Sequence, residues 1–168
     1  MRAVTHRIPA PFLARVDALL AQSGRRLLGL VGPPGAGKST LAQALLEAFP
    51  GAAQVVPMDG YHLANVELAR LGRAGRKGAP DTFDAAGYLA LLERLREQQR
   101  ADEIVYAPEF RREIEEPIAG AIAVLPDTQL VITEGNYLLL DDGPWAGIAQ
   151  LLDDCWYVDI DPALRTDR

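Results

Sequence analysis

The segment RLLGLVGPPGAGKST, residues 26–40, decides the fold of this chain. Its first part is a short, nearly continuous apolar run, as expected for a strand that is buried on both faces. Its second part matches the pattern GxxxxGK[ST] and opens a stretch with apolar residues at helical spacing. A glycine-rich turn between a buried strand and a helix is the context that this phosphate-binding motif requires, so the sequence predicts a P-loop.

The P-loop indicates which residues bind a nucleoside triphosphate. Glycines allow a tight turn in which backbone N–H groups converge on phosphate oxygens, and the N-terminus of the next helix adds partial positive charge. Lys38 is expected to neutralise the β- and γ-phosphates, and Ser39 to offer its hydroxyl to Mg²⁺. The predicted cofactors are therefore ATP and Mg²⁺. The predicted nucleotide-binding residues of the loop are Gly32, Pro33, Pro34, Gly35, Ala36, Gly37, Lys38, Ser39 and Thr40.

Strands and helices are predicted to alternate along the rest of the chain. Apolar spacing predicts helices over 9–21, 38–49 and 84–99, and strands over 26–31, 53–58, 129–133 and 155–160. Asp84 is expected to cap the third helix, whose predicted buried stripe is Ala85, Tyr88, Leu89, Leu92 and Leu95. Residues 60–80 are predicted to form a mobile surface loop, and 104–126 are left open between extended chain and short helix. The alternation predicts an α/β fold with a mainly parallel sheet.

The composition excludes several classes of protein. The chain has 168 residues with 17 basic and 23 acidic side chains, and this charge of −6 argues against a general nucleic-acid binder. A hydrophobic content of 49% is typical of a globular domain, and one cysteine excludes an internal disulfide framework. The sequence contains neither a membrane-spanning apolar run nor the layout of a secretory signal. We therefore expect a cytoplasmic protein without nucleic-acid or membrane partners.

Two carboxylates follow predicted strands, where ligands bind in open α/β sheets. Asp59 could accept the proton of an attacking hydroxyl group or hold a metal-bound water, although an Asp-Gly pair also forms ordinary turns. Glu134 could orient Mg²⁺ directly or through a water, or could be only a solvated carboxylate. We predict Asp59 and Lys38 as catalytic residues, and Ser39 and Glu134 as metal ligands.

Candidate acceptor-binding residues lie in the least regular parts of the sequence. His62 could contact a substrate or be a plain surface histidine, and Lys77 could reach an anionic group or be a solvated loop residue. Arg111 and its neighbour Arg112 could pair with an acidic or phosphorylated acceptor, or face the nearby glutamates. The predicted acceptor-binding set is Asp59, Tyr61, His62, Lys77 and Arg111.

Other P-loop classes lack their signals in this chain. A GTPase reads guanine with an Asn-Lys-x-Asp tetrad, and neither of the two lysines, Lys38 and Lys77, lies in one. Motor and chaperone ATPases usually carry an apolar strand that ends in Asp or Asp-Glu, whereas residues 131–135 read VITEG. The sequence therefore indicates a different kind of P-loop protein.

The ordered motifs GPPGAGKST, VVPMDGYHL, KGAPDTFD, YAPEFRR and VITEGNYLLL resemble the phosphoribulokinase/uridine kinase superfamily. More closely, they resemble bacterial nucleoside/nucleotide kinase-like proteins, some of which are labelled fructose transport system kinases. The resemblance runs from about Leu27 to Arg168 and implies a P-loop NTPase three-layer α/β/α sandwich. It also implies that Asp59 is the catalytic base and that Glu134 is the acidic residue near Mg²⁺.

The resemblance also bears on the domain organisation. Arg168 falls where the family's arginine-bearing lid usually begins, so the resemblance implies a nucleotide-binding role for it. We expect one kinase domain over 1–168, with an N-terminal helix in 1–24 and a core in 25–168. The lid and the last strand are then expected to be missing from the chain.

These features together predict an ATP-dependent kinase that phosphorylates a hydroxyl group of a small metabolite: a sugar, a nucleoside or a pantothenate-like acceptor. Uridine kinases carry an acidic ribose clamp where this chain has the stretch RKGAP, residues 76–80, and a histidine shortly after the Pro-x-Tyr element, where Arg111 and Arg112 follow Phe110 here. The alternative function is a nucleotide-responsive regulatory or binding protein that retains the P-loop without phosphotransfer. The expected partner is the small-molecule acceptor, with a homodimer left open.

Overall fold

Four parallel strands form the central sheet of the computed structural model, which describes residues 8–98 and 102–159. The strands are β1 (Arg26–Val31), β2 (Ala53–Pro57), β5 (Leu130–Gly135) and β6 (Asp154–Tyr157), in the order β2-β5-β1-β6. Each neighbouring pair is parallel. The central strands β1 and β5 are buried along almost their whole length, which explains their continuous apolar sequences. The predicted mainly parallel α/β sheet is confirmed.

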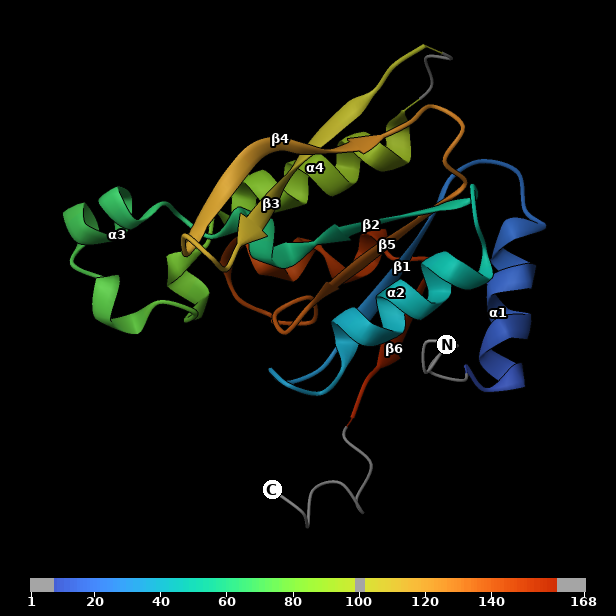
Figure 1. Cartoon of the computed structure of the whole chain (residues 1–168), viewed down its shortest axis with the longest axis horizontal. Helices are drawn as coiled ribbons and strands as arrows, with labels where there is room; N and C mark the ends of the chain where they lie inside the picture. The colour runs from blue at the N-terminus through green and yellow to red at the C-terminus, as the bar shows by residue number, and fades with distance from the viewer. Residues whose placement is uncertain (1–7, 99–101, 160–168) are drawn as a thin grey trace.

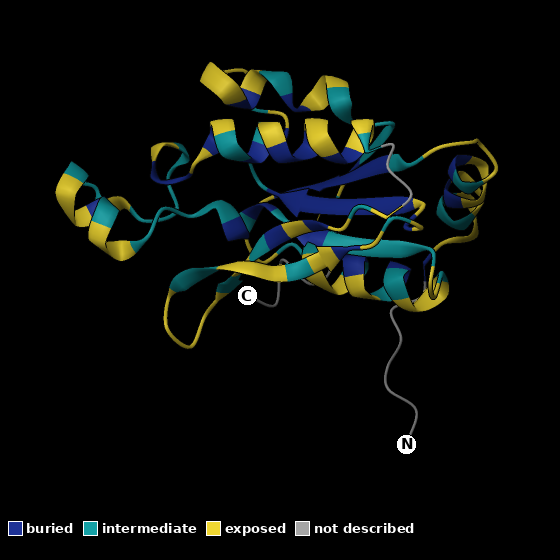
Figure 2. Ribbon diagram, turned by 90° about the horizontal axis from the view of Figure 1, so that it is seen from above, coloured by how far each residue is buried: buried dark blue, intermediate teal, exposed yellow. Residues whose placement is uncertain are grey.

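Helices cover both faces of this sheet (Figure 1). α1 (Ala10–Leu20) and α2 (Lys38–Ala48) pack on one face, and α4 (Ala85–Glu97) packs on the other. Successive side chains of β1 point to opposite faces of the sheet. Leu28 lies in the core on the α1–α2 side, and Leu27 lies in the core on the α4 side. Figure 2 shows the buried strands between helices whose outer surfaces are exposed. This arrangement is the expected three-layer sandwich.

The helix α4 begins as predicted. The carboxylate of Asp84 accepts a hydrogen bond from the backbone N–H of Gly87 at 2.9 Å, which is an N-cap contact. Four of the five predicted stripe residues are buried, but Leu89 is only half-buried and Leu91 is buried in its place. Leu89 packs beside Gly147, in the turns between β5 and β6.

The expectation of a structureless loop over 60–80 is wrong. The segment contains the helix α3 (Asn65–Leu71) and two short 3₁₀ turns, Ala74–Arg76 and Pro80–Thr82. The turns are tied together by the guanidinium of Arg76, which donates two hydrogen bonds to the carboxylate of Asp81 at 2.7 and 2.8 Å. Figure 1 shows α3 at one end of the molecule, away from the central sheet.

Residues 104–126, which the sequence left open, form an antiparallel hairpin of β3 (Val105–Arg111) and β4 (Glu116–Val124). The pairing register shifts between Ala107 and Glu109. Burial changes phase at the same place, because Ala107 is buried before the shift and Pro108 is half-buried immediately after it. Irregularities of this kind turn the side chains of a strand toward a different side.

The ends of the remaining strands differ from the predicted ends. β5 continues through Gly135, two residues beyond the predicted end, and β2 stops at Pro57 because a 3₁₀ turn begins at Met58. β6 ends at Tyr157, and residue 160, the predicted end of this strand, lies outside the described residues. Within the described ranges, no helix is both long and apolar enough to cross a membrane.

Candidate active site

The glycine-rich turn leads from β1 directly into α2, as the motif predicts. Gly35 and Gly37 have φ angles of 78° and 99°, which L side chains rarely adopt. Gly32 is required for another reason, because a Cβ on it would overlap the carbonyl oxygen of Val158. Residues 32–40 therefore form a turn and the first helical residues of α2, whose N-terminus opens onto the loop. This geometry fits the triphosphate of a nucleotide.

Lys38 lies over the loop that precedes it. Its Nζ donates hydrogen bonds to the carbonyl oxygens of Gly32 at 2.7 Å and Pro33 at 3.0 Å. Partial burial lowers the pKa of Lys38, and the negative charges of Glu134 and Asp59 oppose that shift. The structure therefore places the lysine within electrostatic reach of both predicted carboxylates.

Ser39 and Glu134 are in direct contact. The hydroxyl of Ser39 donates a hydrogen bond to Oε1 of Glu134 at 3.1 Å, and the Glu134 side chain lies in the buried strand β5. Burial raises the pKa of Glu134 above its usual range; the charge of Asp59 adds to this shift, and the Ser39 hydrogen bond, Lys38 and Arg112 oppose it.

A hydroxyl and a carboxylate oxygen side by side suit Mg²⁺, which takes hard oxygen ligands and usually completes its shell with phosphate and water. In the described part of the chain, no three His, Cys, Asp or Glu side chains gather as a metal site by themselves. Ser39 and Glu134 therefore fit a magnesium ion that is shared with a bound triphosphate, as predicted from the sequence.

Asp59 lies at the same edge of the sheet, in a 3₁₀ turn (Met58–Tyr61) that follows β2. Pro57, two residues earlier, is the register partner of Glu134 on β5. Asp59 is half-buried, and its carboxylate forms no hydrogen bond or ion pair with any described residue. Its backbone oxygen accepts hydrogen bonds from the backbone N–H of His62 at 3.1 Å and from the His62 ring. His62 therefore fixes the backbone of Asp59, whereas the Asp59 carboxylate has no hydrogen-bond partner among the described residues.

The hairpin packs directly against this turn. A Cβ on Gly60 would overlap the carbonyl oxygen of Pro108, so only glycine allows this approach. The ring of His62 stacks on Phe110 with centroids 4.3 Å apart, and lies 4.2 Å from the ring of Phe83. Its Nδ1 is 2.8 Å from the Asp59 oxygen. The structure thus places His62, a predicted substrate contact, between two aromatic rings that hold the Asp59 turn.

Lys77 is bound to the protein itself. Its Nζ donates a hydrogen bond to Oδ1 of Asn65 at 2.7 Å and another to the backbone oxygen of Glu115, and it lies 5.4 Å from the centre of the Phe110 ring. Asn65 in turn donates its backbone N–H to Glu116 at 2.6 Å. These contacts connect the 64–83 segment to the turn of the hairpin. The contacts of Lys77 are with Asn65, Glu115 and Phe110.

Tyr61 and Tyr137 support the same region. Tyr61, a predicted acceptor contact, is half-buried, with its ring 5.3 Å from that of Tyr88. Burial and the charge of Asp84 raise the pKa of Tyr61 to about 12. The hydroxyl of Tyr137 donates a hydrogen bond to the backbone oxygen of Gly78 at 2.6 Å. Sequence reasoning did not assign Tyr137 to the site, although it follows Glu134 within the motif EGNYLLL.

The two neighbouring arginines of the hairpin differ in their environments. Arg111 is exposed, with Nε 3.7 Å from the carboxylate of Glu109. Arg112 is the one whose charge lowers the pKa of Glu134. Arg111 was the residue predicted from the sequence, and both arginines are exposed. Arg168, the remaining predicted residue, lies outside the described residues.

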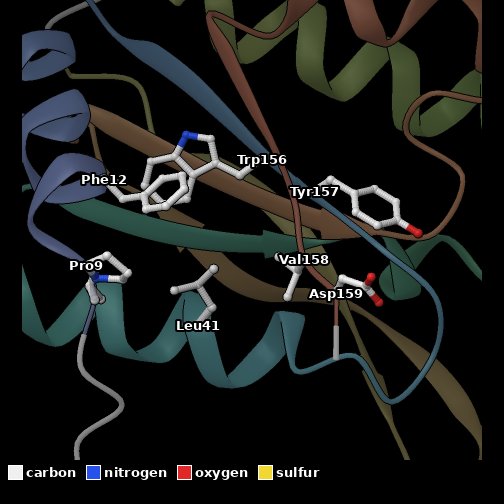
Figure 3. Close-up of a pocket in the computed structure, with 8 residues that line it drawn as sticks. Pro9, Phe12, Leu41, Trp156, Tyr157, Val158 and Asp159 are labelled. Atoms are coloured by element: carbon white, nitrogen blue, oxygen red, sulfur yellow. The ribbon is translucent and has the colours of Figure 1, made fainter. Parts of the chain in front are cut away.

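A separate apolar pocket of about 210 Å³ lies beside β6, across β1 from Glu134 (Figure 3). It is lined by Leu41 of α2 and by side chains at the start of α1 and the end of β6. Phe12 and Trp156 meet edge to face in its wall, with ring centroids 4.8 Å apart. None of the residues predicted for the site lines this pocket.

Comparisons with known proteins identify relatives of similar architecture. No family model matches this chain. The chain is 34% identical over 163 residues to "Putative uridine kinase C227.14" of Schizosaccharomyces pombe, a match that covers 92% of this chain and 68% of that protein. It is 39% identical over 116 residues to "ATP-dependent kinase-like protein notR'" of Aspergillus versicolor, covering 66% of this chain and 67% of that protein.

Solved structures agree with these sequence matches. The crystal structure of a "putative fructose transport system kinase" from Silicibacter sp. TM1040 superposes with a TM-score of 0.77 at 39% identity. That match covers 94% of this chain and 77% of the other. A possible uridine kinase from Bacillus stearothermophilus superposes with a TM-score of 0.60 at 20% identity, over 92% of this chain and 84% of the other, which shows a common fold.

Proposed function

Because this chain belongs to the uridine kinase-like family of P-loop kinases, we propose that it transfers the γ-phosphoryl group of ATP to a hydroxyl group of a small-molecule acceptor. The observation that carries the proposal is the placement of Asp59. Its unpaired carboxylate lies at the carboxyl edge of the parallel sheet, within electrostatic reach of Lys38 and Glu134. Ligands bind at this edge in open α/β sheets.

In the proposed reaction, the acceptor oxygen forms a bond to the γ-phosphorus while the bond from that phosphorus to the β–γ bridging oxygen breaks. ADP leaves, and the hydroxyl proton passes to the carboxylate of Asp59. Such general-base assistance is typically worth about 10²–10⁴-fold. His62 contributes by fixing the backbone of Asp59, which keeps the carboxylate in position.

Lys38 and the loop amides bind the phosphates of ATP, and Lys38 exchanges its contacts with the carbonyls of Gly32 and Pro33 for phosphate oxygens. Ser39 and Glu134 would hold Mg²⁺, which would supply neutralising charge to the bound triphosphate. Glu134 must be ionised to serve as a ligand, although burial favours its protonated form. Binding of the cation favours the ionised form.

The proposal is tested with the purified chain, Mg-ATP and a panel of sugars, nucleosides and carboxylated alcohols. Release of ADP and the mass of the phosphorylated product are measured for each acceptor. We expect one class of acceptor to be phosphorylated and the activity to fall in Asp59→Asn. ADP release at background with every acceptor, combined with tight ATP binding that is unchanged in Asp59→Asn, would instead favour the alternative of a nucleotide-responsive binding protein.

A further inference from the structure

Two buried hydroxyl groups lie in the core beneath the candidate site. Tyr88 of α4 and Thr133 of β5 are both fully buried, and their side-chain oxygens share a hydrogen bond. The hydroxyl of Thr133 also donates a hydrogen bond to the backbone oxygen of Val56 on β2 at 2.7 Å. The three residues therefore form one continuous chain of hydrogen bonds that runs from α4 through β5 to β2.

The direction of this chain follows from the number of protons that are present. The Thr133 hydroxyl has a single proton, which it donates to the Val56 carbonyl, a group that can only accept. Tyr88 must then donate its own proton to the oxygen of Thr133. Burial raises the pKa of Tyr88, so the phenol keeps the proton that this contact requires. Both hydroxyl groups therefore donate toward β2.

The hydrogen-bond chain reaches β5 and β2 where both strands approach the candidate site. Thr133 immediately precedes Glu134, and its register partner Val56 lies three residues before Asp59. Successive residues of a strand point to opposite faces of the sheet, so Thr133 faces α4, whereas Glu134 faces Ser39 of α2. Side-chain hydrogen bonds therefore hold the end of β5 from both faces of the sheet.

Tyr88 also contacts the chain on the other side of Asp59. The centroid of its ring lies 5.3 Å from that of Tyr61, two residues after Asp59. The same turn packs closely on the end of β5, because a Cβ on Gly135 would lie 2.6 Å from the side chain of Met58. One side chain of α4 therefore supports the backbone both before and after the proposed general base.

Stability alone does not explain this buried pair of hydroxyl groups. Replacing both partners of a buried hydrogen bond by apolar groups of the same shape is often nearly neutral for stability. Phenylalanine and valine have nearly the shapes of tyrosine and threonine, and the core on the α4 side is otherwise apolar around them. Hydrogen bonds, unlike apolar contacts, are directional. They restrict how β2 and β5 lie at the point where Asp59 and Glu134 leave the sheet.

We propose that Tyr88 is a positioning residue for phosphoryl transfer: acting through Thr133, it holds the carboxylates of Asp59 and Glu134 at the spacing that the reaction requires. Tyr88 itself is fully buried and touches no ligand of the site. A small displacement of a reacting group slows a reaction even where the substrate still binds. This inference rests on the proposed kinase function and adds to it a residue that lies outside the site.

The experiment compares two variants in which stability and activity should change differently. The double variant Tyr88→Phe/Thr133→Val removes both hydroxyl groups and keeps the core filled, so its Tm should stay near that of the parent. Its kcat with the best acceptor of the panel should fall about 10- to 100-fold, and the KM of ATP should stay within about twofold. Thr133→Ser keeps the hydroxyl but loses a buried methyl group, so its Tm should fall while kcat stays within about twofold of the parent.

Tyr106→Phe is the matched control, because it removes the hydroxyl group of an exposed tyrosine on β3. Its Tm and kcat should equal those of the parent. A purely structural role of the two buried hydroxyl groups predicts instead that kcat follows Tm through the whole series. That result would overturn the inference, and so would a double variant that keeps the parent kcat.

Amide hydrogen exchange separates this inference from the proposed function. The backbone N–H of His62 donates to the backbone oxygen of Asp59 at 3.1 Å, so its exchange reports the opening of the Asp59 turn. By NMR, this exchange should be about 5- to 10-fold faster in the double variant and unchanged in Tyr106→Phe. If no acceptor is phosphorylated, the proposed function fails for this panel and the exchange rate decides. Faster exchange in the double variant then supports the inference, and equal exchange overturns it.

Discussion

The hydroxyl of Ser39 donates a hydrogen bond to Glu134 across 3.1 Å and so joins the first turn of α2 to the central strand β5. The two residues lie 95 positions apart in the sequence, and only the parallel pairing of β1 with β5 brings them together. The same contact offers two oxygens to a cation. The proposed cation site therefore depends on the pairing of β1 with β5.

Replacing Glu134 with glutamine should separate stability from function. Because burial raises the pKa of Glu134, the folded protein binds that proton more tightly than the unfolded chain does, and the ionised side chain destabilises the fold as the pH rises. Glu134→Gln should therefore be more stable than the parent at neutral pH, with Tm higher by about 2–4 °C for each kcal/mol relieved. Mg²⁺-dependent ATP binding should weaken roughly 10- to 100-fold.

The pH dependence of the Glu134→Gln effect tests its cause. The gain in stability should disappear below the ordinary glutamate pKa of about 4.3, where the parent side chain is protonated in both states. Thermal unfolding at a series of pH values measures this difference. A gain of equal size at pH 3 and pH 8 would show that the ionisation of Glu134 is not responsible.

The Asp59→Asn variant tests the proposed general base. The amide cannot take the acceptor's proton, so kcat should fall about 10²–10⁴-fold. The affinity for ATP should be nearly unchanged, because Lys38 and the loop amides bind the phosphates. Steady-state kinetics and nucleotide titration measure the two effects. Retention of the parent kcat would remove Asp59 from the mechanism.

Gly60→Ala should displace the Asp59 turn from the hairpin that packs against it. A Cβ at this position overlaps the Pro108 carbonyl oxygen, and relief requires the hairpin or the turn to move. Overpacking of this kind typically costs about 1–3 kcal/mol. We expect a lower Tm together with reduced kcat. Gly75→Ala is the matched control, because nothing lies within 4 Å of a Cβ there, and its Tm should not fall.

Lys77→Met should loosen the connection between the 64–83 segment and the hairpin. The variant keeps a long apolar stem but loses the hydrogen bonds from Nζ to Asn65 and Glu115. Cleavage within 64–83 under limited proteolysis should become faster, with a modest fall in global stability of about 1 kcal/mol. Arg94→Met, which breaks an ion pair with Glu103 on the far end of α4, should not accelerate this cleavage.

The sequence predicted the parts of the fold whose signals are local. The P-loop requires glycines at fixed spacing, and the capping aspartate Asp84 needs only the first turn of its own helix. The helix α3 was missed because seven residues carry too weak a periodicity, and its segment is held by contacts with the distant hairpin. The contacts of Lys77 could not be read from the sequence, because its protein partner, Glu115, lies 38 residues away.

The burial pattern of β3 shows a second limit. Alternation along a strand follows from sequence only if the register is regular, and here the register shifts two residues before the strand ends. No pattern in YAPEFRR marks this shift. The pairing of β3 with β4 was needed to locate the shift.

The change of phase within β3 also divides the hairpin into two sections that can evolve separately. Val105 and Ala107 fill the core together with Val124, whereas residues 109–116 lie outside the buried core. Exchange of this outer section between homologues should then leave the packing of the protein unchanged. Substitutions in the hairpin tip can therefore change the surroundings of the Asp59 turn without disturbing the packing of the core.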